Sequence, residues 1–120
     1  MQQIGALFYV AWGVLHLYAA YQVYSKLGVR QPAGMLQGRV YQSAWNLAFF
    51  ALAAIVVALV FNWSNSPLGF WLNLTLTSVT DIGFLLFIIW PRYLPLWPGL
   101  LGPGLWVLAL GFSALGQFAR

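Results

Sequence analysis

Cysteine and glutamate are both missing from this sequence, and its only acidic residue is Asp81. Without cysteine the chain can form no disulfide, no thiolate nucleophile and no thiolate metal site. A single histidine, His16, and a single acid also cannot complete a metal site of three or four strong ligands within one protomer. The sequence therefore indicates no metal and no cofactor, and the one cofactor that it leaves conceivable is a haem held by His16.

Charge of either sign is scarce, at 5% of the residues against 62% hydrophobic residues. A soluble domain carries about 25% charged residues, so this chain has too few to cover a water-facing surface. Four apolar stretches each approach the roughly 20 residues needed to cross a bilayer. They cover residues 4–25, 39–62, 67–90 and 99–119. We therefore predict one membrane domain over residues 1–120, an all-α integral membrane four-helix bundle with short loops.

The basic residues predict how this bundle is oriented. They are Lys26, Arg30, Arg39, Arg92 and Arg120. Because loops rich in Lys and Arg stay in the cytoplasm, loops 26–39 and 91–99 are expected to be cytoplasmic and both termini outside. We expect this membrane to be the bacterial inner (plasma) membrane. The few charges lie beside membrane spans, so the net charge of +4 indicates topology, and no nucleic-acid partner is expected.

Polar side chains follow one face of each of the first three spans. They are Tyr9, Trp12 and His16 in the first, Arg39, Gln42 and Asn46 in the second, and Asn73, Thr77, Thr80 and Asp81 in the third. Such faces are expected inside the bundle or against a partner, because exposing them to lipid is costly. Asn73 and Thr77 are interpreted first as polar links between helices.

His16 and Asp81 are the candidates for chemistry. Spans one and three run in the same direction, and a rise of 1.5 Å per residue puts His16 about 18 Å and Asp81 about 21 Å deep. The two side chains are thus expected at nearly one level, with Asn46 converging on them from the cytoplasmic side. Placed together, an acid and an imidazole can move a proton or stabilise a developing cation. The alternative is a His–Asp bond that only locks two helices together.

The preferred hypothesis is an enzyme or binding protein for a lipophilic small molecule, with acid/base chemistry of the isomerase, cyclase or hydratase type. His16 and Asp81 would be catalytic. The expected substrate-binding residues are Asn46, Tyr9, Trp12, Gln42, Thr77, Thr80 and Arg39. Arg39 also lies where its side chain can reach lipid headgroups, and this is its simpler role.

Two other classes of function remain open. One is a proton-coupled transporter in which Asp81 titrates, which at this length requires an oligomer. The other is an accessory subunit of a larger membrane complex. A face of small residues on the fourth span suits a homo-oligomer or a partner helix. It comprises Gly102, Ala109, Ser113 and Gly116.

The segment GVLHLYAAYQVY (Gly13–Tyr24) resembles the first helix of small, DoxX-like four-helix bacterial membrane proteins, in which a His-Leu-Tyr triplet recurs mid-helix. The following GRVYQSAWNLAFFA resembles the polar start of their second helix. The group commonly has an acid soon after the triplet, where this chain has Gln22 and Val23. The resemblance implies a four-helix bundle and adds nothing about the reaction.

Overall fold

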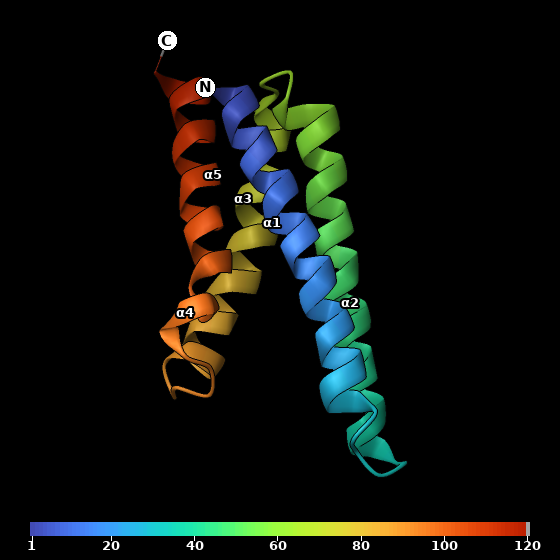
Figure 1. Ribbon diagram of the computed structural model, residues 1–120. Coiled ribbons are helices and arrows are strands. Elements are labelled where there is room, and N and C mark those ends of the chain that lie inside the picture. Colours follow the sequence, from blue (N-terminus) through green and yellow to red (C-terminus); the bar gives the residue numbers. More distant parts are fainter. Residues whose placement is uncertain (120) are drawn as a thin grey trace.

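The computed structural model describes residues 1–119, and all the secondary-structure elements of this part of the chain are helices (Figure 1). Arg120, the basic residue expected outside, falls beyond the described residues. Helix α1 (Gln2–Gln22) continues as a π-helical segment η1 (Val23–Gly28), α2 (Met35–Val57) as η2 (Ala58–Asn62), and α3 (Pro67–Phe84) as η3 (Leu85–Ile89). A short α4 (Leu96–Gly99) precedes α5 (Leu101–Phe118).

Four of these helices are long and apolar enough to cross a membrane, as the sequence predicted. They are Gln2–Gly28, Met35–Asn62, Pro67–Ile89 and Leu101–Phe118. The first two therefore run several residues beyond the expected spans, and the last is the shortest at 18 residues.

Local sequence signals explain where the helices begin and end. Pro67 occupies the first turn of α3, where its missing N–H costs nothing, and Ser66 before it is extended. The chain between η3 and α5 contains Pro91, Pro95 and Pro98, and there it forms a turn, the short α4 and a break at Leu100. Proline can neither donate a backbone hydrogen bond nor fit the interior of a helix, so a continuous fourth span cannot start earlier.

The helices form an antiparallel bundle in which α1 packs against both α2 and α5, while α3 packs against α2 and α5 (Figure 1). Small residues allow the helix backbones to approach one another closely. A Cβ on Gly5 would lie 2.7 Å from the backbone nitrogen of Ser113, and one on Gly13 would clash with Ile55. The core between them consists largely of alanines, with Tyr9 and Trp12 fully buried.

The small-residue face of α5 is used within the chain itself. Gly116 lies against Gln2, Ser113 against Gly5, and Gly102 against His16. Within the chain, α1 covers these small residues. A homo-oligomer or partner helix at the fourth span stays a prediction.

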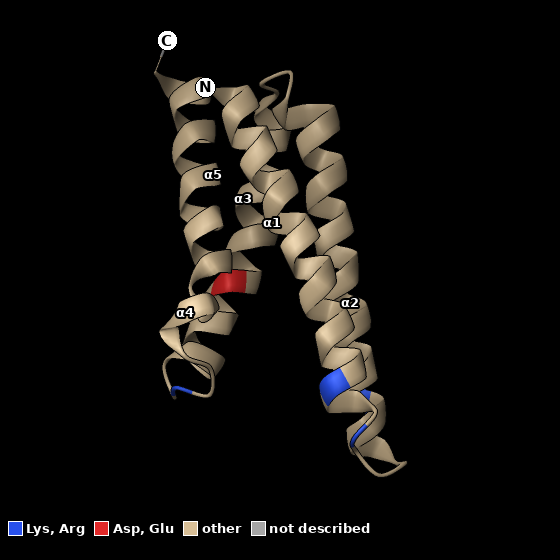
Figure 2. Cartoon of the chain, in the orientation of Figure 1, with Lys and Arg blue, Asp and Glu red and all other residues tan. Residues whose placement is uncertain are grey.

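The two halves of the bundle separate towards one end. Both termini and the α2–α3 connection lie at the other end, where all the helices pack together (Figure 1). Beyond the middle of the bundle, η1 makes its principal contacts with α2 and none of comparable extent with α3 or η3. The described Lys and Arg residues all lie at this diverging end (Figure 2).

Candidate functional site

Trp12 and His16 form one half of the site, and both lie on α1. They lie four residues apart on α1, the spacing that puts side chains on one face, and their rings stack with centroids 3.9 Å apart. His16 Nδ1 lies 2.7 Å from the backbone carbonyl oxygen of Trp12. Because a carbonyl only accepts hydrogen bonds, Nδ1 must carry a hydrogen, which leaves Nε2 as the variable nitrogen.

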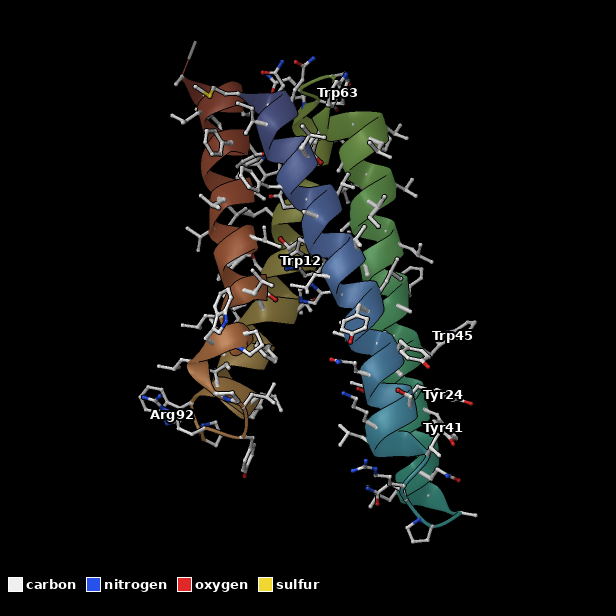
Figure 3. All side chains as sticks on the ribbon, viewed as in Figure 1. Trp12, Tyr24, Tyr41, Trp45, Trp63 and Arg92 are labelled. Atoms are coloured by element: carbon white, nitrogen blue, oxygen red, sulfur yellow. The ribbon has the colours of Figure 1, made fainter. Side chains whose placement is uncertain are left out.

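Asp81 supplies the other half from α3 and has no accessible surface. The indole Nε1 of Trp12 donates a hydrogen bond to its Oδ2 at 2.9 Å. The other oxygen, Oδ1, lies 3.3 Å from Nε2 of His16 and makes no hydrogen bond of ordinary geometry with the described residues. One carboxylate oxygen thus accepts a hydrogen bond from Trp12, while the other lies near the imidazole without one. Figure 3 labels Trp12 near the middle of the bundle.

One shared proton would make the contact between His16 and Asp81 attractive. If neither Nε2 nor the carboxyl carried it, a lone pair would face a buried negative charge with no donor between them. With one proton, either an imidazolium faces a carboxylate or a neutral acid faces a neutral imidazole, and both are attractive. The geometry therefore suits a proton that moves between two groups, which is the requirement for general acid–base chemistry.

Helix α5 closes the site beside the imidazole. A Cβ on Gly102 would lie 3.0 Å from His16 Cε1 and 3.4 Å from Nε2, so glycine lets the imidazole pack closely against α5. The side chain of His16 keeps 10% of its surface accessible, whereas Asp81 keeps none.

A column of buried polar side chains continues from Asp81 along α3. The hydroxyl of Thr77 donates to the Asn73 carbonyl at 2.6 Å. The amide nitrogen of Asn73 donates to the Ala54 carbonyl at 3.2 Å and to Asn62 Oδ1 at 2.8 Å. Asn73 thus links α3 to α2 as we expected, while Thr77 bonds only within its own helix. The column leads towards the end of the bundle that holds both termini.

The remaining predicted site residues divide into two groups. Tyr9 is fully buried with its hydroxyl facing Thr77 and Ser113, whereas Thr80 is half-buried and donates to the carbonyl of Leu76. The polar face of α2 is exposed, and Arg39 donates only to Gln42, at 3.0 Å.

Asn46 does not converge on the pair, and this expectation was wrong. It lies exposed on α2. The face of α2 that packs inward carries Ala44, Ala51 and Ala54 instead, because alanine permits a closer approach of the helix backbones. Helix rise gave Asn46 a plausible depth, but the rotation of α2 turns its side chain away.

The structure adds a hydrogen-bonding role for Trp12, which we had expected only to line a pocket. One sequence signal pointed to it, since a buried indole N–H needs an acceptor and Asp81 is the only carboxylate in the chain. Gly102 was expected only in a packing face, and its contact with His16 had no separate signal.

Both ring nitrogens of His16 are engaged, one by a carbonyl oxygen and the other beside Asp81. Holding a haem or metal through His16 would therefore require the site to rearrange. Among residues 1–119 there is no group of three or more potential metal-ligating side chains.

The chain was compared with family models, curated proteins and solved structures. None of them matches. The function is therefore argued from the geometry of the site alone.

Proposed function

We propose that this is an integral membrane protein in which His16 and Asp81 act as acid and base on a lipophilic small molecule, in chemistry of the isomerase, cyclase or hydratase type. One observation carries the proposal: a fully buried carboxyl group faces an imidazole nitrogen at 3.3 Å. The carboxyl is held there by the Trp12 indole. An ionisable group inside a membrane is costly and is a functional candidate by default.

Access to the pair supports a lipophilic substrate. The helices diverge beyond the middle of the bundle (Figure 1), and within the pair only His16 keeps accessible side-chain surface. A molecule dissolved in the bilayer would approach between the α1–α2 and α3–α5 pairs, bringing a reacting carbon or oxygen atom to Nε2. Trp12 would hold Asp81 in place while the proton shifts between Asp81 and His16.

The proposed orientation places both termini outside and the loops at 26–39 and 91–99 in the cytoplasm of a bacterial cell. The gathering of the described Lys and Arg residues at one end supports it (Figure 2). Arg39 would then reach phosphate headgroups near Gln42, and these two residues and Asn46 would meet a substrate only at its entry. Because the chain lacks cysteine, cysteines introduced singly at Ala33 and Ser64 test this. A membrane-impermeant maleimide applied to intact cells should label only the second.

The catalytic proposal is tested by comparing lipid extracts of cells that express the wild type, Asp81→Asn or His16→Ala. Both variants should lose the same product and accumulate the same lipophilic precursor. Thr75→Val is the control, because its hydroxyl is exposed and bonds only within α3. If all four extracts are identical while both site variants are folded and present at wild-type levels, the acid–base role is refuted.

Proton-coupled transport is the second candidate, and the buried polar column beside Asp81 favours it. At 120 residues the chain is small for a transport path, so this function requires an oligomer. A protein that is monomeric in mild detergent and in vesicles would exclude it. The accessory-subunit hypothesis stays open, and α1 covers the small residues of α5 within the chain.

A further inference from the structure

Three buried polar atoms near the centre of the bundle have no hydrogen-bonding partner among residues 1–119. They are the Tyr9 hydroxyl oxygen, Asn73 Oδ1 and Asp81 Oδ1, on residues with no accessible surface. Buried polar atoms in folded proteins are almost always paired with protein groups or ordered water. Water bound beside these atoms would supply the missing partners.

Their spacing suits single bridging waters. Asn73, Thr77 and Asp81 lie at successive four-residue intervals on the buried face of α3. Four residues correspond to about 6 Å of helix, which is close to two hydrogen-bond lengths placed end to end. One water between each neighbouring pair therefore spans the interval.

Tyr9 completes the middle of the column from α1. Its hydroxyl faces the hydroxyls of Thr77 on α3 and Ser113 on α5, so polar groups from several helices meet at one point. A buried water needs two to four polar partners, and this point provides them. Gly5 lets α1 approach α5 closely at this point, because a Cβ there would lie 2.9 Å from Ser113 Oγ.

The polar groups lead in one direction only. From Asp81 they run towards Asn62, at the end of the bundle where both termini lie (Figure 1). In the other direction residues 82–89 of α3 and η3 carry no polar side chain. No other acidic side chain exists in the chain, and the described Lys and Arg residues lie at the far end (Figure 2).

We propose that Tyr9, Thr77, Ser113 and Asn73 hold bound water and with it carry protons between Asp81 and the end of the bundle that holds the termini. Each water or hydroxyl accepts one proton and releases another, so no member of the column changes its charge. Asp81 Oδ1 takes up the proton delivered by the column, and the pair passes one proton from His16 Nε2 to the substrate. This inference rests on the proposed function, in which the pair holds an exchangeable proton.

The composition of the chain makes the proton observable. Asp81 is the only side-chain carboxyl and His16 the only imidazole. The infrared band of a protonated carboxyl side chain therefore reports Asp81, and the Nε2–H signal of 15N-labelled histidine reports His16. The protein is transferred from H2O to D2O, and the rate at which the proton exchanges for deuterium is measured on whichever of the two groups carries it. Loss of a signal in Asp81→Asn or His16→Ala assigns that signal to its residue.

Thr77→Val should slow this exchange by about tenfold, the effect of one lost hydrogen-bonding link. Tyr9→Phe should slow it similarly, and Thr77→Ser should restore the wild-type rate. Thr75→Val is the matched control, because Thr75 makes the same type of bond within α3 but is exposed. In sealed vesicles with uniformly oriented protein, exchange should follow D2O added on the side of the termini.

Equal exchange rates in Thr77→Val, Tyr9→Phe and Thr75→Val would overturn the proposed column, as would exchange that follows D2O added on the Lys- and Arg-rich side. Should Thr77→Val fail to fold, the comparison of Tyr9→Phe with Thr75→Val decides the question. The two proposals fail separately. Slowed exchange with unchanged lipid extracts refutes the enzymatic role alone, while changed extracts with unslowed exchange refute the column alone.

Discussion

Replacing Trp12 by phenylalanine is the sharpest test of how the site is held together. The change keeps an aromatic ring against His16 but removes the indole N–H that donates to Asp81 Oδ2 at 2.9 Å. An acceptor left buried without a partner costs about 1–3 kcal/mol. The smaller ring leaves a cavity worth about 1 kcal/mol more, because Trp12 is fully buried. We therefore expect Trp12→Phe to lower the free energy of unfolding by about 2–4 kcal/mol.

The assay is reversible unfolding in mixed detergent micelles, followed by circular dichroism, with Trp106→Phe as the control. Trp106 also donates a side-chain hydrogen bond, to Ser78 Oγ at 3.1 Å, but it is only partly buried. Bonds of this kind between membrane helices average about 0.6 kcal/mol, so the control should lose about 1 kcal/mol or less.

A double-mutant cycle isolates the hydrogen bond from the cavity. Trp12→Phe is measured in the wild type and in Asp81→Ala, and the cavity contribution is nearly the same in both. The remaining coupling should be about 1–3 kcal/mol, the cost of the unpaired carboxyl oxygen. A coupling near zero would mean that the Trp12–Asp81 contact does not stabilise the fold, and the reasoning about the site would be refuted.

Two further comparisons use the same substitution at a buried or contacting position and at an open one. The first is measured by the same unfolding assay and the second by the 15N signals of His16. Asn73→Leu should cost about 1–3 kcal/mol because it removes two buried hydrogen bonds, whereas Asn46→Leu on the exposed face should stay within about 0.5 kcal/mol; equal effects would contradict the assignment. Gly102→Ala should shift the 15N signals of His16, since the new Cβ lies 3.0 Å from the imidazole, while Gly104→Ala meets nothing within 4 Å and should leave them unchanged.

The helices were predictable from sequence because length and hydropathy act along the chain. Apolar runs of about 20 residues favour helices whatever their neighbours are, and the four long helices confirm this. Their ends were less predictable. Residues 26–28 were predicted to belong to the first loop, yet the segment Val23–Gly28 continues α1 as a π-helical turn. The segment packs against α2, and this contact extends the helix. A contact between distant residues cannot be read from the hydropathy pattern along the chain.

The sequence predicted how deep the site residues lie in the bundle, but only partly which way their side chains point. Helix rise placed His16 and Asp81 at one level, and the structure brings them to 3.3 Å. Their roles stay predictions. The same arithmetic placed Asn46 near them, but a residue's direction depends on which face of its helix packs inward. On α2 that face is set by the alanines against α1 and α3, so Asn46 points outward.

The unequal environment of the two Asp81 oxygens favours the proposed proton site over a purely structural link between helices. A carboxyl that only joins α1 to α3 would be expected to satisfy both oxygens, since each buried oxygen without a partner is costly. Oδ2 fits that expectation through Trp12. Oδ1 does not, because it lies 3.3 Å from an imidazole nitrogen without a bond of ordinary geometry. Trp12 therefore explains how the lone acid is tolerated inside the bundle. Oδ1, 3.3 Å from His16 Nε2, is where the proposed transferable proton would pass between the two groups.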